Sequence, residues 1–437
     1  MNPDKLPRRH LLQGLLAVGA ASCAKADPPP APAADPPQPA GDAWSRFRAE
    51  FELSPAWIHM TGFLLVSHPR AVREAIEGWR RKLDENPAYA VEEHGHGTHA
   101  QEAAATYMGA RAEEIALTDS TTMGLGTLYT GLPLAAGDEV LTSTHDHMST
   151  HAALLYATER AGAKLVKVPM YGRPFEATAA GMVDAIAKGI TPATRVVAIT
   201  WVHSATGVKT PVKGIAEAVA KANQGRAPKD RVILCVDGVH GFGVDDVTMG
   251  DLGCDFFVAG CHKWIFGPRG TGVIWGKADL WPLLKPSIPS FSAELGGWWM
   301  GKSGESMPKT TANMMSPGGF HSFEHRWALP AAFELHQRLG KAKVAARIHA
   351  LNRQCKEGLK KMKHVTLHTP VDDAISAGII CFESEGMKPK EIVERLREKK
   401  IIASTSPYVT TYARVAPSLL TSEAEVEATL RAIHDLG

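Results

Sequence analysis

The chain has 437 residues, enough for a large enzyme with one big domain and a smaller one rather than a string of short modules. Its 48 Lys and Arg residues balance 46 Asp and Glu residues, which gives a formal net charge of +2. This balance provides no electrostatic reason to expect a nucleic acid or an acidic surface as partner.

The first residues have the layout of an export segment. Arg8 and Arg9 precede the apolar run Leu11–Ala21, an arrangement typical of a twin-arginine signal. The run is too short to span a bilayer comfortably. We therefore expect residues 1–26 to be a signal segment and the mature protein to be periplasmic.

A stretch of different composition follows this predicted signal. Residues 27–43 are rich in Pro and Ala, which favours an extended linker over a packed element. Cys23 is either a lipid attachment site, and then a membrane anchor, or it lies near an ordinary cleavage site. Ala20 stands where a lipobox usually has Leu, which favours ordinary cleavage.

From Pro69 onward, amphipathic stretches alternate with short β-rich runs, which is the pattern of an α/β fold. Helices are predicted over Pro69–Asn86, Ala100–Met108, Ser149–Ala161, Ala177–Lys188 and Pro211–Asn223. Buried strands are predicted over Glu139–Ser143, Lys164–Val168, Arg195–Trp201, Arg231–Val236, Asp255–Ala259 and Gly272–Trp275. The last three strands leave too little chain between them for full crossover helices, so we expect the sheet order to change there.

These elements predict a mostly parallel central sheet flanked by helices, in a large domain at residues 76–310. A smaller α+β domain is expected at residues 320–437, and it begins with a helical region from Trp327 to Met362. Residues 44–75 are expected to pack on this smaller domain.

Two polar segments end two neighbouring predicted strands. Asp237 closes the strand before Gly238-Val239-His240, and Lys263 follows the next strand within Gly260-Cys261-His262-Lys263-Trp264. The carboxyl ends of strands line the ligand crevice of an open α/β sheet, so both side chains should point into it. A Lys amine can hold the aldehyde of pyridoxal 5′-phosphate (PLP), and a carboxylate keeps the pyridine nitrogen of that cofactor protonated. The simpler alternative is an ordinary Asp–Lys ion pair.

A helix start between Leu117 and Leu128 is the candidate phosphate site. Free N–H groups at a helix N-terminus bind anions, and the hydroxyls of Thr121 and Thr122 can add to them. Alone this motif is weak, because most such sequences are only helix caps.

The order of these motifs resembles the class V aminotransferase-fold PLP enzymes of fold type I. The residues that carry the resemblance are Thr121-Thr122, Asp146-His147, Val202-His203-Ser204, Asp237-Gly238, His240, His262-Lys263-Trp264 and Gly267-Pro268. Within that family the chain looks most like the isopenicillin N epimerase-like branch, which also contains carbon–sulfur lyases. The resemblance covers about Trp44 to Gly437 and implies PLP as cofactor and a homodimer.

The resemblance also implies a role for each matched position. Lys263 would hold the cofactor as a Schiff base and act in catalysis together with Asp237 and His147, the last of which would stack on the cofactor ring. The cofactor-binding set would be Thr121, Thr122, His147, Ser204, Asp237, His240, His262 and Lys263. In this set Ser204 and His240 match positions at the ring hydroxyl, and His262 matches a phosphate contact. Arg414 matches the arginine that pairs with the α-carboxylate of an amino-acid substrate.

Two departures from the family pattern limit the function. Desulfurases carry a nucleophilic Cys shortly before the substrate arginine, but residues 403–412 contain none, which argues against persulfide transfer. The usual Gly-Thr that reaches the phosphate of the neighbouring subunit is replaced in Phe323–Trp327, where Arg326 is the candidate anion contact.

Other chemistries are less favoured. The His-rich stretch Glu92–His99 is expected to be a solvated loop rather than a metal site, and no His and carboxylate set has a familiar metal spacing. The five cysteines after Cys23 are expected to be buried free thiols. No Gly-x-Gly-x-x-Gly follows an early strand, which disfavours a dinucleotide oxidoreductase. The sequence predicts an amino-acid epimerase or carbon–sulfur lyase, with a class V aminotransferase or a non-catalytic binding protein as alternatives.

Overall fold

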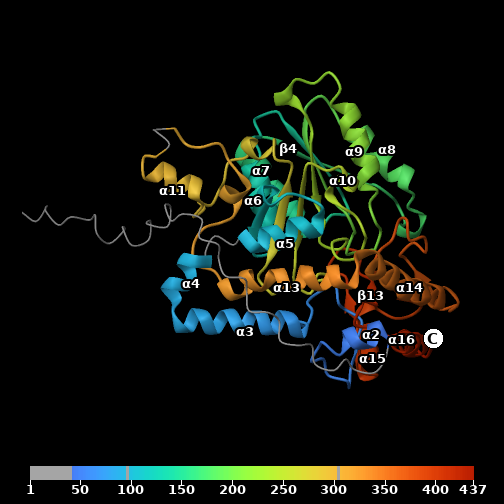
Figure 1. Cartoon of the computed structure of the whole chain (residues 1–437). Helices are drawn as coiled ribbons and strands as arrows, with labels where there is room; N and C mark the ends of the chain where they lie inside the picture. Colours follow the sequence, from blue (N-terminus) through green and yellow to red (C-terminus); the bar gives the residue numbers. More distant parts are fainter. Residues whose placement is uncertain (1–41, 95–97, 303–305) are drawn as a thin grey trace, which may run out of the picture.

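The computed structural model describes residues 42–94, 98–302 and 306–437 (Figure 1). The predicted signal segment, Cys23 and nearly all of the predicted linker lie outside the described residues, as does His96. The strands are β1 (Ile58–His59), β2 (Ile115–Thr118), β3 (Glu139–Ser143), β4 (Lys164–Val168), β5 (Thr194–Thr200), β6 (Ile233–Asp237), β7 (Phe256–Gly260), β8 (Gly272–Gly276), β9 (Val365–Leu367), β10 (Ile380–Ser384), β11 (Ile401–Ile402), β12 (Ser404–Thr405) and β13 (Ala413–Val415).

The helices of the amino-terminal half are α2 (Ala43–Arg48), α3 (Arg70–Glu85), α4 (Pro87–His94), α5 (Thr98–Met108), α6 (Thr121–Gly131), α7 (Met148–Ala161), α8 (Ala179–Gly189) and α9 (Val212–Ala222). Those of the carboxy-terminal half are α10 (Met249–Leu252), α11 (Ala293–Trp299), α12 (Ala312–Met315), α13 (Phe323–Leu339), α14 (Lys341–Lys360), α15 (Pro389–Glu398) and α16 (Glu423–His434).

Seven strands form the central sheet in the order β2-β8-β7-β6-β5-β3-β4. Neighbours pair in parallel except at β8, which is antiparallel to both β2 and β7. The predicted mostly parallel sheet flanked by helices is confirmed. The change in sheet order expected among the last three strands is wrong, because β6, β7 and β8 are successive neighbours in the sheet. What changes there is the strand direction: β6 and β7 are parallel although only the short α10 separates them, and β8 is antiparallel to β7.

Both faces of the central sheet are buried, which explains the nearly continuous apolar runs of its strands. Side chains alternate between the faces, so Leu234 and Val236 of β6 belong to one core with α8, α9 and α13. Ile233 and Cys235 belong to a second core with α6 and α7. The two helix layers lie on opposite sides of the sheet (Figure 1). This sandwich holds the strand ends rigidly.

A smaller antiparallel sheet, of order β12-β13-β10-β9, lies beside α14, α15 and α16 and has an apolar core of its own. The chain before the central sheet also contributes to this region. Ile58 of β1 pairs in parallel with Ile401 of β11, and Met60 is fully buried in the same core. Phe47 of α2 packs instead against Phe266 of the large core.

Two helical regions differ from the sequence prediction. The region predicted from Trp327 to Met362 starts at Phe323 and consists of two helices, because the chain breaks at Gly340 with φ +85°. The expected loop Glu92–His99 is also partly wrong, since α4 continues to His94 and α5 begins at Thr98. Most of the stability of a helix in a protein comes from packing, so helices can extend into a stretch whose polar sequence suggests a loop.

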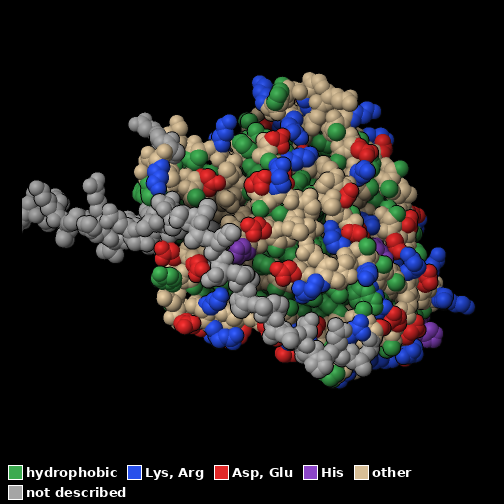
Figure 2. All heavy atoms as spheres, viewed as in Figure 1, with side chains coloured by type: hydrophobic (Ala, Val, Ile, Leu, Met, Phe, Trp, Pro, Cys, Tyr) green, Lys and Arg blue, Asp and Glu red, His purple; other side chains and the backbone are tan. Residues whose placement is uncertain are grey.

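The distribution of charged side chains and the state of the cysteines agree with what the composition indicates. Basic and acidic side chains are interspersed on the face shown in Figure 2. The cysteines within the described residues are buried free thiols, as predicted, namely Cys235, Cys254, Cys261, Cys355 and Cys381. No helix among the described residues has the length and apolar character needed to cross a membrane.

Gly340 provides a test of the α13–α14 junction. Its backbone angles, φ +85° and ψ 119°, suit glycine alone, so Gly340→Ala should lower the free energy of unfolding by about 1–3 kcal/mol. Gly78 in the middle of α3 is the control, because a Cβ there meets no atom within 4 Å and helical Ala is favoured over Gly by up to about 1 kcal/mol. Chemical denaturation followed by circular dichroism measures both effects. Equal stability of the two variants would contradict the assigned strain.

Candidate active site

The candidate site lies at the carboxyl end of the central sheet. Asp237 is the last residue of β6, and the parallel neighbour β7 ends at Gly260, three residues before Lys263. The Nζ atom of Lys263 lies 3.4 Å from Nε2 of His240. The pairing of β6 with β7 therefore brings the predicted carboxylate and amine to the same edge, as the sequence predicted.

Lys263 and Asp237 influence each other without forming an ion pair. Among the residues that the structure describes, their charged atoms are not within 4 Å of each other, so the simple ion-pair alternative is not what forms here. Burial lowers the pKa of Lys263 to about 8, and Asp237 opposes this shift. Burial raises the pKa of Asp237 to about 6, opposed by the Val239 N–H and by Lys263. Each group thus acts on the other's pKa without an ion pair between them.

The loop that carries Lys263 is held by an unusual backbone conformation. Phe266 has φ +58°, and its N–H donates to the carbonyl oxygen of Lys263 at 3.0 Å. The Phe266 ring is buried and packs edge-on against Phe47 and Phe51. A bulky residue in this conformation persists only where its surroundings enforce it. The amino-terminal segment thus fixes the loop on which the amine lies.

The start of α7 supplies two groups to the site. His147 is the N-cap residue, and its Nδ1 accepts from the Ser149 N–H at 3.2 Å. Thr150 donates from Oγ1 to Oδ2 of Asp237 at 3.4 Å. Burial lowers the pKa of His147, and Lys263 and Arg414 lower it further, so its ring is neutral at pH 7. A neutral imidazole is suited to stacking against a flat cofactor ring.

Asp146 fixes the position of His147. Its buried carboxylate accepts from Thr142 Oγ1 and the Ser143 N–H at 2.8 Å each, and from the Thr200 N–H at 2.6 Å. These bonds tie the end of β3 to the end of β5. A carboxylate satisfied in this way acts as a rigid junction rather than as a free base.

The candidate phosphate end lies at the start of α6. Thr121 Oγ1 accepts from the Gly260 N–H at 2.8 Å, which leaves its own hydroxyl proton available to donate. A Cβ on Gly260 would lie 2.8 Å from the His262 ring and 3.0 Å from Thr121 Oγ1, so only glycine permits this approach. Thr121 and His262 therefore come together, whereas the Thr122 side chain is exposed.

Arg326 reaches the same helix end. Its Nη2 lies 3.3 Å from Oδ1 of Asp119, and His321 Nδ1 lies 3.4 Å from the other oxygen. Asp119 directly precedes Ser120, the residue that caps α6. The arginine suggested as an anion contact is thus near the candidate phosphate site, but it shares its charge with a carboxylate.

Arg414 is a buried residue of β13. Its guanidinium donates to the Ser204 carbonyl at 2.7 Å, to the Thr405 carbonyl at 2.9 Å and to Ser404 Oγ at 3.3 Å. Three of its five N–H groups are used, so two remain for a carboxylate. The guanidinium carbon also lies 4.7 Å from the centre of the Phe63 ring. The planar group is therefore held ready for a bidentate partner.

Two residues that the sequence did not single out complete the site. Tyr408 Oη lies 2.7 Å from Ser204 Oγ, so the Ser204 hydroxyl contacts this phenol. Phe63 is fully buried and lies edge-on to His240. Neither belongs to a recognisable short motif. The only signal for Tyr408 was its place in the loop where related enzymes carry a cysteine.

The residues fit a PLP group. Nδ1 of His240 and Nδ1 of His262 are buried and have no hydrogen-bond partner among the described residues. A buried polar atom without a partner calls for an explanation, and a ligand with polar groups beside these two rings would supply one. Among the described residues, no three His, Cys, Asp or Glu side chains are placed to hold a metal ion.

Comparison with known proteins places this arrangement in a family. Residues 73–432 match the aminotransferase class-V family. The chain belongs to that family. Membership identifies PLP as the cofactor, as predicted. Lys263, Asp237 and the groups around them are this family member's candidate cofactor site.

The relatives of this class V chain have different activities. It is 24% identical to a probable cysteine desulfurase of Vibrio cholerae over 359 residues, which cover 77% of this chain and 81% of that one. It is 23% identical to the isopenicillin N epimerase of Streptomyces clavuligerus over 402 residues, 88% and 96% of the two chains.

Solved structures confirm the fold. C-DES with glycine covalently linked to its PLP cofactor has a TM-score of 0.78 and 21% identity, covering 89% of this chain and 99% of that chain. Cysteine desulfurase CsdA of Escherichia coli has a TM-score of 0.75 and 20% identity, with 91% and 98% covered.

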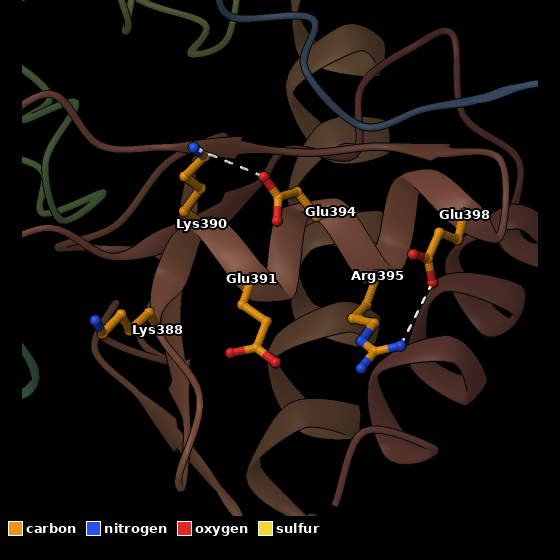
Figure 3. A pocket seen from close by; sticks show the side chains of 6 residues that line it. All are labelled: Lys388, Lys390, Glu391, Glu394, Arg395 and Glu398. Carbon is orange, nitrogen blue, oxygen red and sulfur yellow. Dashed lines mark ion pairs between the residues drawn. The ribbon is translucent and has the colours of Figure 1, made fainter.

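A hollow lies away from this site, at α15. Its volume is about 500 Å³, and its lining is charged, with Lys388, Lys390, Glu391, Glu394, Arg395 and Glu398 (Figure 3). Lys390 pairs with Glu394 at 3.8 Å and Arg395 pairs with Glu398 at 3.7 Å, both along the helix. Exposed pairs of this kind are common on helices and indicate no ligand.

The lowered pKa of Lys263 predicts how the apoprotein captures its cofactor. Only the neutral amine attacks an aldehyde, so the rate of PLP capture should rise about tenfold per pH unit and level off above a midpoint near pH 8. Because Asp237 raises the pKa of Lys263, Asp237→Asn should move the midpoint to lower pH. Stopped-flow absorbance measures the rate. A midpoint near the ordinary value of 10.5, or an upward shift in the variant, would refute this assignment.

Proposed function

We propose that this chain is a PLP enzyme that acts at the α-carbon of an amino acid, of the epimerase or carbon–sulfur lyase type. The observation that carries the proposal is the convergence of Lys263, Asp237 and Arg414 at one end of the central sheet. Asp237 and Lys263 each shift the other's pKa, and Arg414 acts on that of Lys263 as well. An amine, a carboxylate and a guanidinium with two free N–H groups match an aldehyde cofactor and a substrate carboxylate.

The side chains have separate tasks in this proposal. The bound cofactor supplies an electron sink for the pair of electrons left when a bond at the substrate α-carbon breaks. Lys263 would hold the cofactor, and its neutral Nζ would take the α-proton of the substrate. Asp237 would keep a positive charge on the pyridine nitrogen, and Thr150 and Val239 orient its carboxylate. Arg414 binds the α-carboxylate and excludes substrates that lack one.

The reaction type is inferred from the residues of the loop between β12 and β13. No cysteine stands between Ala403 and Tyr412, so no thiol is available there to receive a sulfur atom. Tyr408 lies on that loop and contacts Ser204. Epimerisation, or β-elimination that releases a thiol, needs proton transfer but no nucleophilic sulfur on the enzyme. We therefore favour these two reactions over desulfuration with persulfide transfer.

We further propose that the enzyme is exported by the twin-arginine route to the periplasm and works as a homodimer. Arg8 and Arg9 before the apolar run support the export route, and Cys23 remains a candidate lipid anchor. A surface for a second copy is supported by exposed apolar side chains in one segment, namely Ile288, Phe291, Trp299, Met300, Met307 and Phe320.

Product analysis with a panel of L- and D-amino acids and thioether amino acids tests the proposed function. The purified protein should show a visible absorption band that borohydride bleaches and should either invert the α-carbon or release a thiol with a keto acid. Lys263→Ala should lose the band and the turnover. A stoichiometric keto acid with pyridoxamine would indicate an aminotransferase. Wild-type protein that retains no PLP would refute the proposal.

Arg414→Lys tests the carboxylate anchor. Lys keeps the positive charge but loses the planar fork, so KM for the amino acid should rise by about 10- to 100-fold, while the cofactor absorbance stays unchanged. Arg353→Lys, an exposed arginine that pairs with Asp373, is the matched control. Steady-state kinetics and a cofactor titration measure the two effects. Equal losses of cofactor and substrate affinity would show that Arg414 acts only on the local structure.

A further inference from the structure

Tyr408 lies on the loop between β12 and β13 and turns toward the site. The loop is closed at its base by the Ser406 N–H, which donates to the Tyr412 carbonyl at 2.9 Å, and by the Tyr412 N–H, which donates to Ser406 Oγ at 2.9 Å. Val409 next to Tyr408 is fully exposed, whereas Tyr408 is mostly covered. The loop therefore directs one aromatic side chain inward from a solvent-exposed tip.

The phenol of Tyr408 lies between the carboxylate anchor and the stacking histidine. Its Oη is 2.7 Å from Ser204 Oγ, and the Ser204 carbonyl is itself bound by Arg414 at 2.7 Å. The Tyr408 ring lies edge-on to His147, with 6.0 Å between the ring centres. A substrate whose carboxylate pairs with Arg414 and whose amine reaches the cofactor beside His147 has Tyr408 as a neighbour.

The phenol of Tyr408 carries a proton that it can donate. Burial raises the pKa of Tyr408 to about 12, so the hydroxyl keeps its proton at neutral pH. Ser204 can pass a replacement proton, since a hydroxyl both donates and accepts. Lys263 and Tyr408 belong to different elements, the loop after β7 and the loop before β13, and no hydrogen bond joins them in the described structure. Two such groups can transfer protons at two different positions of one substrate.

We propose that Tyr408 is the second proton-transfer residue of the site and protonates the substrate after Lys263 has removed the α-proton. This inference rests on the proposed function and assigns the protonation step that follows removal of the α-proton. In epimerisation the α C–H bond breaks with its proton going to Lys263 Nζ, and the Tyr408 O–H bond then breaks as a new C–H bond forms at the α-carbon. In elimination the Cβ–S bond breaks with its electron pair on sulfur, and Tyr408 protonates the released thiolate.

In both reactions the phenolate left on Tyr408 regains a proton from solvent through Ser204, and the ammonium of Lys263 releases one to solvent. No oxidant or reductant is needed. The Ser204–Tyr408 hydrogen bond is therefore the path by which the donor is reset between turnovers.

This inference is tested by measuring exchange of the α-proton and formation of product as two separate rates. Wild type and Tyr408→Phe, loaded with PLP, are incubated in D₂O with the amino acid that the panel identifies as a substrate. Nuclear magnetic resonance follows deuterium at the α-carbon, and chiral chromatography or thiol release follows the product. Tyr412→Phe on the same loop is the control, because that ring packs on His368, with 4.1 Å between the ring centres.

Tyr408→Phe should retain the cofactor band and Lys263-dependent α-deuteration, while product formation falls at least about 100-fold, the usual size of a lost general acid. Tyr412→Phe should form product at the wild-type rate. Wild-type turnover in Tyr408→Phe would overturn the inference, and so would parallel loss of exchange and product. Absence of the band and of exchange in the wild type would instead overturn the proposed function, so the two failures are distinguishable.

Discussion

The parallel pairing of β6 with β7 is the constraint on which the rest of the site depends. Val236 and Asp237 stand opposite Phe257 and Val258, so the two strands end side by side. Side chains just beyond parallel strand ends meet at one edge of the sheet, which is where α/β folds bind ligands. A carboxylate and an amine at the ends of two successive strands therefore share one electrostatic environment.

That environment disfavours charge on both groups. The pKa of Lys263 falls from 10.5 to about 8, and that of Asp237 rises from 3.8 to about 6, with burial as the largest cause in each case. A shift of one pKa unit corresponds to about 1.4 kcal/mol, so each group loses on the order of a few kcal/mol of charge stabilisation. A cofactor that takes the amine into a covalent bond and offers a positive nitrogen to the carboxylate relieves both penalties. The fold supplies the rigidity that this strained state needs, through cores on both faces of the sheet.

The second half of the site comes from the smaller sheet. Arg414 and Tyr408 belong to β13 and the loop before it, and both reach Ser204, which follows β5 of the central sheet. Phe63, on the chain that joins β1 to α3, packs on Arg414 from a third direction. In the proposed function, substrate recognition would therefore depend on how the two sheets are held together. A cofactor site confined to the central sheet lacks both the anchor and the proposed proton donor.

Much of the fold and the cofactor half of the site followed from local sequence. Short, nearly continuous apolar runs predicted the strands of the central sheet, because a strand that is buried on both faces is apolar along most of its length. Asp237, Lys263 and Thr121 were predicted because polar residues at strand and helix ends leave a local signal, whereas His147 was predicted only from the family resemblance. The break at Gly340 and the helical ends of the His-rich stretch were missed, because such boundaries depend on packing partners.

The sequence by itself therefore determined the fold class, the cofactor and the residues that end the parallel strands. Only the tertiary structure decided that Arg414 keeps two N–H groups free, that Thr122 faces outward, and that Tyr408 contacts Ser204. The physical reason is that strand periodicity and helix caps are encoded within a few consecutive residues. The hydrogen bond between Ser204 and Tyr408 instead joins positions 204 residues apart and exists only once two separate sheets have packed against each other.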